Sequence, residues 1–142
     1  MVTGSSTGIG REIAIQLAER GAKLLVHGRT LSPELEQTIS MIEQSGSNAI
    51  SVTEDFESCG DFGTFVERAW DTHGSIDIWI NNAGGDVLTG TRAGDSLEQK
   101  LDYLLRVDVR ASWFLSREIG WRMKAVRKSG SASERLLSLI HI

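Results

Sequence analysis

The chain has 142 residues, of which 40% are hydrophobic and 24% are charged, as in an ordinary soluble domain. Its formal net charge of −4 argues against a role in binding nucleic acid. Cys59 is the only cysteine, which excludes an intrachain disulfide and is typical of a reducing compartment, and no apolar run is long enough to span a membrane. We therefore expect a cytoplasmic protein that binds neither nucleic acid nor membrane.

The first residues form one strand–helix unit of the predicted fold. Residues 1–3 are predicted to end a strand, and a glycine-rich turn over 4–10 follows it. Apolar residues at helical spacing then predict a helix from about 9 to 20. A short apolar run over 23–27 predicts the next strand.

Two further helix–strand pairs and a loop follow. The helix predicted over 32–45 opens with a serine–proline pair, which is typical of a helix start, and a strand is predicted over 49–53. A helix over 61–73 precedes a strand over 76–80, where nearly every residue is apolar, as in a strand buried on both faces. Residues 81–95 are polar and rich in glycine, which predicts a loop.

The last part of the chain is mainly helical. A long helical region is predicted over 96–127 with a break near 106–108, and the apolar run over 136–142 predicts a fifth strand. Strands that alternate with helices of about ten to fifteen residues indicate a parallel sheet covered on both faces. We therefore expect a single α/β domain over residues 1–142, with a doubly wound parallel sheet truncated after about its fifth strand.

The turn after the first strand carries a phosphate-binding pattern of glycines. Gly4, Gly8 and Gly10 have the spacing Gly-x-x-x-Gly-x-Gly, which permits a tight turn and the close approach of a pyrophosphate. The N-terminus of the next helix offers free N–H groups, and the hydroxyls of Ser6 and Thr7 add donors. The alternative is a turn that uses glycine only for its shape. The position of the motif in the first strand–helix turn favours phosphate binding.

The end of the second strand bears on the choice between NAD and NADP. NAD sites place an acidic residue near this point to hold the ribose hydroxyls, whereas NADP sites supply an arginine for the 2′-phosphate. No acidic residue occurs from Arg20 to Thr30, and Arg29 lies just past the strand. This pattern favours NADP(H) over NAD(H); the alternative is that Arg29 is a solvated loop residue.

A second segment of small residues, Asn-Asn-Ala-Gly-Gly over 81–85, directly follows the strand predicted over 76–80. Ligands of open α/β sheets bind beyond the carboxyl ends of the strands, where this segment must lie. Its small residues allow the backbone to pass close to a ribose and a nicotinamide. Taken alone, the segment is also compatible with a plain turn.

Together these motifs resemble the short-chain dehydrogenase/reductase superfamily, particularly its 3-oxoacyl-carrier-protein-reductase-like members. The family's Thr-Gly-x-x-x-Gly-x-Gly motif is met by residues 3–10, and its Asn-Asn-Ala-Gly motif by residues 81–84. The resemblance covers residues 2 to about 123. It implies a Rossmann-type NAD(P)-binding domain of an oxidoreductase that transfers hydride between a nicotinamide and a carbonyl or alcohol substrate.

The resemblance also implies individual contacts. Asp55 matches the family's acidic residue that accepts a hydrogen bond from the adenine amino group; the alternative is an exposed acid at a strand end. Thr3, Asn81 and Asn82 match residues that tie the central strands and the loop together. The cofactor-binding residues so implied are Gly4, Ser6, Thr7, Gly8, Ile9, Gly10, Arg29, Asp55, Phe56, Asn82, Ala83 and Gly84.

Two departures from the family pattern concern catalysis. Asp108 stands where the family usually has an asparagine whose backbone carbonyl helps to hold a water of the proton relay. The family's catalytic serine and its Tyr-x-x-x-Lys pair have no counterpart, because the only tyrosine, Tyr103, has Val107 four residues later. The sequence therefore assigns no catalytic residue. Both ends of the chain suggest a partial reading frame, so we expect a cofactor-binding fragment that is inactive alone.

The expected partners are a small carbonyl or alcohol substrate in the full-length protein and further copies of it, in a dimer or tetramer built through the long helix over 108–127. The alternatives are a non-catalytic dinucleotide-binding module and an inactive truncated product. His27, His73 and His141 are scattered and have no neighbours at metal-ligand spacing, so no metal site is expected. The four tryptophans are expected to be packing residues: Trp70, Trp79, Trp113 and Trp121.

Overall fold

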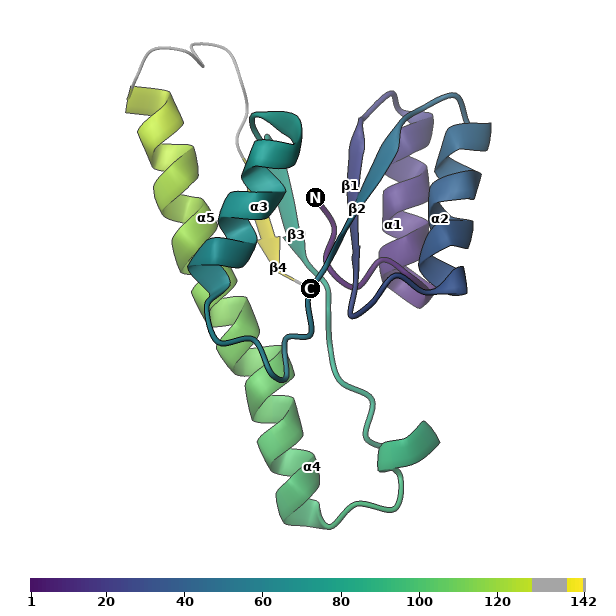
Figure 1. The fold of residues 1–142 in the computed structure, drawn as a ribbon, viewed down its shortest axis with the longest axis vertical. Helices are drawn as coiled ribbons and strands as arrows, with labels where there is room; N and C mark the ends of the chain where they lie inside the picture. Colours follow the sequence, from purple (N-terminus) through teal and green to yellow (C-terminus); the bar gives the residue numbers. More distant parts are fainter. Residues whose placement is uncertain (129–137, 142) are drawn as a thin grey trace.

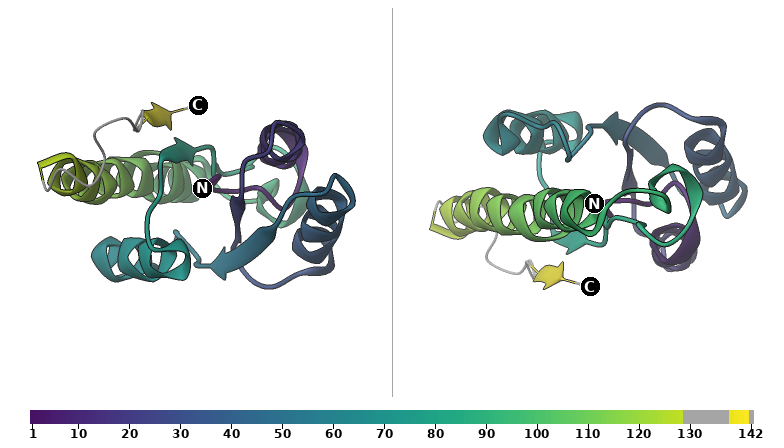
Figure 2. Two further views of the ribbon diagram at one scale, coloured as in Figure 1. Left: turned by 90° about the horizontal axis from the view of Figure 1, so that it is seen from above. Right: turned by 90° about the horizontal axis from the view of Figure 1, so that it is seen from below.

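The computed structural model describes residues 1–128 and 138–141 of the chain. Its helices lie on two sides of a set of strands (Figures 1 and 2). All strand pairings are parallel. This arrangement confirms the α/β, doubly wound class that the sequence predicts.

Within residues 1–128 and 138–141, four strands form two parallel pairs. β1 (Leu24–Gly28) pairs with β2 (Ala49–Thr53), and β3 (Ile78–Asn81) pairs with β4 (Ser138–His141). β2 has the predicted bounds, whereas β1 and β3 begin one and two residues later than predicted. β4 confirms part of the predicted fifth strand; positions 136, 137 and 142 of that prediction lie outside the described residues.

The first three residues join the two strand pairs. Val2 forms parallel bridges with Val26 of β1 and Ile80 of β3. The N–H of Val2 donates to the carbonyl of Leu25, and the N–H of Thr3 donates to that of Ile80, both at 3.0 Å. The segment predicted to end a strand is therefore central, and the spatial order is β2, β1, the Val2 segment, β3, β4.

Two helices, α1 (Gly8–Glu19) and α2 (Pro33–Gln44), cover one side of the strands and lie within a residue or two of their predicted bounds. Ser32 caps α2 by accepting a hydrogen bond from the N–H of Leu35. Apolar side chains of both helices and of three strands form one core on this side. Its fully buried members are Val2, Ala14, Ala18, Leu24, Val26, Leu35, Ile42 and Ile80.

The opposite side is covered by α3 (Phe62–His73) and α5 (Ala111–Lys128). Alternation along the strands explains the two cores: Leu25 contributes to this one, while its neighbours Leu24 and Val26 contribute to the other. The largest fully buried side chains of this second core are Leu25, Phe65, Trp79, Leu115 and Ile119.

The long helical region does not break as predicted. α4 (Leu97–Leu104) continues without interruption into a π-helical segment (Leu105–Arg110) and then into α5. The wider π turns keep the chain helical through the positions where the break was predicted. The loop predicted over 81–95 likewise contains one short 3₁₀ turn, Gly90–Arg92.

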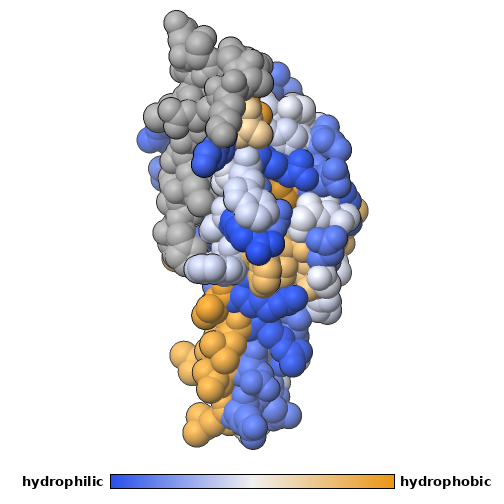
Figure 3. All heavy atoms as spheres, turned by 90° about the vertical axis from the view of Figure 1, so that its left-hand side faces the viewer, coloured by the Kyte–Doolittle hydropathy of each residue, from blue (hydrophilic) through white to orange (hydrophobic). Residues whose placement is uncertain are grey.

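An exposed row of apolar side chains runs along this helical region, and Figure 3 shows apolar surface on the corresponding lower part of the molecule. The row, named the apolar stripe from here on, consists of Leu97, Leu101, Leu105, Val109, Trp113 and Trp121. The expectation that the tryptophans pack is confirmed for Trp79 and for the partly buried Trp70. It is wrong for Trp113 and Trp121, which are 69% and 60% exposed.

Candidate functional site

A groove of about 600 Å³ lies where the strands reach their carboxyl ends. Most of its lining comes from the glycine turn over 4–10, the end of β1 and the residues after it, the residues after β2, and the loop after β3; Tyr103 and Val107 of the helical region complete it. Of the twelve residues predicted to bind a cofactor, all except Gly8 are among its lining residues. The structure thus brings together side chains that are up to about eighty positions apart in the chain.

The glycine turn and the loop after β3 touch so closely that side chains cannot be accommodated between them. A methyl group added to Gly4 would lie 2.7 Å from Cα of Ala83, and one added to Gly10 would overlap the side-chain amide of Asn82 and the carbonyl oxygen of Gly4. Gly4 also has a φ of +62°, which favours glycine. These glycines are therefore required by the contact between two protein segments, whatever binds beside them.

The N-terminus of α1 opens onto the groove with its N–H groups unused. Thr7, the N-cap residue, makes no side-chain cap, and no acidic residue lies in the first turn. Within the described part of the chain, the N–H groups of Gly8, Ile9 and Gly10 have no acceptor. Free N–H groups and the positive end of the helix dipole together form an anion-binding position.

The hydroxyl of Thr3 holds the loop after β3 against the central strand. Thr3 Oγ1 accepts hydrogen bonds from the N–H groups of Asn82 (2.9 Å) and Ala83 (3.0 Å), and it donates to the carbonyl of Ile80 (3.3 Å). The side-chain amide of Asn82 donates to the carbonyls of Thr3 (3.0 Å) and Gly4 (3.1 Å). Thr3 and Asn82 therefore have the tying role that the resemblance implies.

Asn81 ties a different pair of elements. Its Oδ1 accepts a hydrogen bond from Nε1 of the buried Trp79 at 2.8 Å, and its Nδ2 donates to Oγ of Ser116 in α5 at 2.9 Å. Both partners lie on the α3–α5 side of the strands. Asn81 thus fixes the end of β3 to a helix, while Asn82 fixes the following loop to the glycine turn.

Arg11 is a structural member of the site that the sequence did not single out. Its guanidinium donates to the carbonyl of Ser6 (2.5 Å from Nη2), to Oγ1 of Thr38 (2.9 Å) and to the carbonyl of Glu34 (3.0 Å). These bonds join the glycine turn to α2. An arginine directly after the last glycine of the motif was the available signal.

Arg29 and Asp55 occupy two adjacent walls of the groove. Arg29 is exposed, and it has no ion pair or hydrogen bond to any residue that the structure describes. The preceding Gly28 lies near Ser6, because a methyl group added to Gly28 would be 3.7 Å from Cβ of Ser6. Asp55 is half-buried and its Oδ1 accepts a hydrogen bond from the N–H of Glu57 at 3.0 Å.

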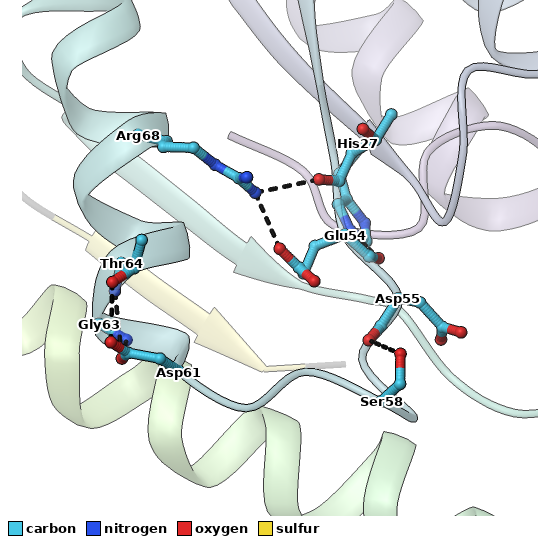
Figure 4. A network of polar contacts seen from close by, with 9 residues as sticks. His27, Glu54, Asp55, Ser58, Asp61, Gly63, Thr64 and Arg68 are labelled. Carbon is cyan, nitrogen blue, oxygen red and sulfur yellow. Dashed lines mark hydrogen bonds and ion pairs between the residues drawn. The ribbon is translucent and has the colours of Figure 1, made fainter.

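His27 lies beneath the groove and bridges two of its walls. The N–H of Gly4 donates to Nδ1 of the ring, and Nε2 lies 3.0 Å from the carbonyl oxygen of Glu54. Burial lowers the pKa of His27 to about 4, although the bond to Glu54 favours the charged form. The carboxylate of Glu54 pairs with Arg68 of α3 at 2.8 Å (Figure 4).

The loop after β3 is also held from the helical side. Asp108, in the π-helical segment, accepts a hydrogen bond at Oδ1 from the N–H of Gly85 at 2.7 Å. Tyr103 is buried in α4 as a packing residue, and the guanidinium of Arg92 lies 3.9 Å from the centre of its ring. Arg92 pairs with Glu57 at 2.6 Å, which links this loop to the residues after β2.

The described residues give no sign of two other kinds of site. They contain no group of three His, Cys, Asp or Glu side chains arranged to hold a metal ion. None of their helices has the length and apolar character that crossing a membrane requires.

A family model described as short chain dehydrogenase matches residues 1–132. The chain is 36% identical over 83 residues to the short-chain dehydrogenase/reductase homolog YusS of Bacillus subtilis, an alignment that covers 58% of this chain and 76% of that protein. Among solved structures it is similar to a metagenomic short-chain oxidoreductase in complex with NADP, with 28% identity, a TM-score of 0.76, and 89% of this chain and 56% of that chain covered.

A second solved structure is that of 3-oxoacyl (acyl-carrier-protein) reductase from Agrobacterium tumefaciens with NADP bound. It is 28% identical, with a TM-score of 0.74, and the match covers 87% of this chain and 46% of that chain. The chain thus spans about half the length of these two structures. It spans between 29% and 44% of the length of several other curated relatives.

Replacing Thr3 by valine tests the hydroxyl as the link between the two segments. Thr3→Val keeps the side-chain volume but leaves the N–H groups of Asn82 and Ala83 without their acceptor, so we expect the free energy of unfolding to fall by about 2–3 kcal/mol. Thr3→Ser keeps the hydroxyl and should cost about 1 kcal/mol. Urea unfolding followed by circular dichroism measures both; a serine variant as unstable as the valine variant would contradict this role.

His27 should make stability depend on pH in the acid range. Its pKa is about 4 when folded and 6.5 when unfolded, so the unfolded chain binds the proton more readily. The stability that comes from keeping the ring neutral is complete above pH 6.5 and is lost as pH falls toward 4, by about 3 kcal/mol. His27→Asn does not titrate and should remove this part of the loss. Equal acid sensitivity of both proteins in urea unfolding would assign the effect to other groups.

Proposed function

The chain belongs to the short-chain dehydrogenase family, and we propose that it binds NADP(H) for an oxidoreductase acting on a carbonyl or alcohol substrate. Family membership supports a nicotinamide cofactor and oxidoreductase chemistry. The preference for NADP(H) over NAD(H) goes beyond family membership and is part of what we propose. The observation that carries it is a single groove lined by the glycine turn, Arg29, Asp55 and the loop over 82–84.

The pyrophosphate fits the glycine turn. A pyrophosphate needs hydrogen-bond donors, space for its oxygen atoms and no negative charge beside it. The start of α1 meets these needs, because three of its first-turn N–H groups lack acceptors and no carboxylate lies in the first turn. Ser6 and Thr7 line the groove beside these groups and add hydroxyl donors. In this proposal the turn binds the two phosphates and fixes the direction of the dinucleotide.

The 2′-phosphate of NADP(H) fits beside Arg29. The guanidinium is exposed and has no partner in the described part of the chain, and the adjacent Gly28 lies against Ser6 of the glycine turn. A phosphate dianion would neutralise this cation through charge-assisted hydrogen bonds. The solvated-loop interpretation of Arg29 predicts no preference between the two cofactors.

The adenine fits the wall formed by the residues after β2. Asp55 lines the groove with a half-buried carboxylate that can accept a hydrogen bond from an amino group. Phe56 is buried with its ring beneath this wall, so it offers the groove its backbone and not its side chain. These positions agree with the contacts implied by the family resemblance.

The bound cofactor would supply the hydride, and this chain's residues would bind and orient it. Asp108 is a positioning residue: its carboxylate holds the loop over 82–85 by accepting the hydrogen bond from the N–H of Gly85. No serine and Tyr-x-x-x-Lys set can be assigned, since Tyr103 is buried and followed by Val107 four residues later. We therefore propose that this chain alone binds NADP(H) without turnover.

We also propose a cytoplasmic location for the protein, which the single cysteine favours.

We also propose that the apolar stripe binds a second copy of the chain. Its members are spaced by four residues from Leu97 to Trp113, and they stay on one side although such a row drifts by about 40° per step around a straight α-helix. The π-helical segment offsets that drift. The charged position in the row, Arg117, pairs with Glu118 at 2.8 Å and lies over Trp121 at 4.9 Å. A continuous row of this kind suits the same row of another copy across a two-fold axis.

Titration of the chain with NADPH and with NADH, followed by nucleotide fluorescence, tests the cofactor proposal. Arg29→Asp should weaken NADPH binding by about 10- to 100-fold, because a charge-assisted phosphate contact becomes repulsive, and should change NADH binding by less than about threefold. Arg20→Asp makes the same charge change at an exposed position outside the groove and should leave both affinities unchanged.

An equal effect of Arg29→Asp on both cofactors would contradict the NADP(H) preference. Absence of saturable binding of either cofactor by the unaltered chain would contradict cofactor binding itself. Assays of NADPH oxidation with a panel of small ketones test whether this chain alone catalyses a reaction. Turnover in these assays would contradict the proposal that it is inactive.

Self-association is tested by replacing both exposed tryptophans of the apolar stripe. Trp113→Ser combined with Trp121→Ser should weaken the association by at least about tenfold, since two large apolar side chains would leave the interface. Leu88→Ser is the matched control, because Leu88 is 83% exposed and lies outside the stripe. Sedimentation equilibrium over a range of concentrations gives the dissociation constants. A monomeric unaltered chain, or equal effects of both replacements, would overturn this proposal.

A further inference from the structure

His27 is a buried polar residue to which the proposed function assigns no role. It is the fourth residue of β1 and is 2% exposed. Its ring stacks on that of Phe56, with centroids 4.4 Å apart and an angle of 12° between the planes, and Phe65 approaches it edge-on at 5.4 Å. An apolar ring would fill this space as well, so packing alone does not account for an imidazole.

The two hydrogen bonds of the ring define one protonation state. The N–H of Gly4 can only donate, so Nδ1, 3.0 Å away, accepts. The carbonyl of Glu54 can only accept, so Nε2, also 3.0 Å away, carries the proton. The ring is therefore neutral, and both of its nitrogen atoms are occupied. A proton on Nδ1 would place two donors against each other.

These partners belong to two different walls of the groove. Gly4 begins the turn assigned to the pyrophosphate, and Glu54 directly precedes the residues assigned to the adenine. The backbone of His27 reinforces the first connection, because its carbonyl accepts from the N–H of Ser5 (2.8 Å) and its N–H donates to Oγ of Ser5 (2.9 Å). The His27 ring reinforces the connection to the adenine-binding wall by stacking on Phe56.

We propose that His27 is a positioning residue for the cofactor, whose imidazole sets the phosphate-binding turn and the adenine-binding wall in one fixed relation. This inference rests on the proposed function of the groove. It assigns to His27 the distance and orientation between the two subsites, without contact between its side chain and the cofactor. The dinucleotide spans both subsites, so its binding depends on the link; a ligand that occupies one subsite does not need it.

Two amide variants separate the two halves of the link. In His27→Asn the side-chain oxygen can take the place of Nδ1 and keep the bond from Gly4, while the bond to Glu54 is lost. In His27→Gln the amide reaches the place of Nε2 and can keep the bond to Glu54, while the N–H of Gly4 loses its acceptor. Both introduce a buried amide of the same chemistry, and each breaks the link at one end only.

NADPH and adenosine 2′-monophosphate are the two ligands to compare, because the second carries the adenine and the 2′-phosphate without the pyrophosphate. His27→Gln should weaken NADPH binding about tenfold, the worth of one or two hydrogen bonds, and adenosine 2′-monophosphate binding by less than about twofold. His27→Asn breaks the link at Glu54 and should weaken NADPH binding to a similar extent, again with an effect of less than about twofold on adenosine 2′-monophosphate. Unchanged NADPH affinity in either variant, or equal losses for both ligands, would overturn the proposal.

A measurement on the unaltered chain covers the case in which a variant fails to fold. Nitrogen chemical shifts of the imidazole at pH 7 should show a bare Nδ1 and a protonated Nε2, and the amide of Gly4 should exchange slowly with solvent. The opposite tautomer, or a rapidly exchanging Gly4 amide, would overturn the assigned role. If the unaltered chain binds neither NADPH nor NADH, the proposed function fails together with this inference; if it binds and either variant binds as tightly as it does, the inference alone fails.

Discussion

The contact between the glycine turn and the loop after β3 is the constraint on which the groove depends. These segments are about eighty residues apart in the chain, and they meet at a separation that leaves no room for a side chain at Gly4 or Gly10. One hydroxyl, that of Thr3, holds the loop through hydrogen bonds from the N–H groups of Asn82 and Ala83, and it also donates to the carbonyl of Ile80 in β3. Because the contact is so close, small changes in either segment are transmitted to the other, and the phosphate-binding turn has a single position.

The walls of the groove are loops, yet polar side chains fix them in place. Arg11 of α1 holds the glycine turn to α2, Asn82 holds the loop after β3 to the turn, and Asp108 holds the same loop to the helical side. Loops carry the binding groups of many proteins, and their precision comes from such supports. The groove is therefore largely formed before any ligand enters it.

The sequence predicted the order and type of the main elements because glycine, serine and proline mark their ends and apolar spacing marks their faces. It also placed the glycine turn, Arg29, Asp55 and the loop over 82–84 at one edge of the sheet. The role of His27 was not predicted, since its two partners come from other strands and no local pattern reveals them. A single polar residue in an otherwise apolar strand was the available signal.

Two other features escaped the sequence for related reasons. The exposure of Trp113 and Trp121 depends on which side of the helix faces the core, and the π-helical segment shifts that side away from where the spacing of a regular α-helix would place it. Composition gives a tryptophan a strong tendency to be buried but does not say whether its own chain buries it. The continuity of the helix was equally hidden, because only backbone geometry distinguishes a wider π turn from a break.

The π-helical segment also has a consequence for how such a chain can change by insertion and deletion. A π turn holds one residue more than an α turn, so loss of one residue from 105–110 would leave a continuous helix. Because six residues in π turns advance around the helix axis about as far as five residues in α turns, Tyr103 and the first half of the apolar stripe would keep nearly the same direction relative to α5. The π-helical segment is thus a place where the chain can lose one residue while the faces of the helical region on both sides of it stay as they are.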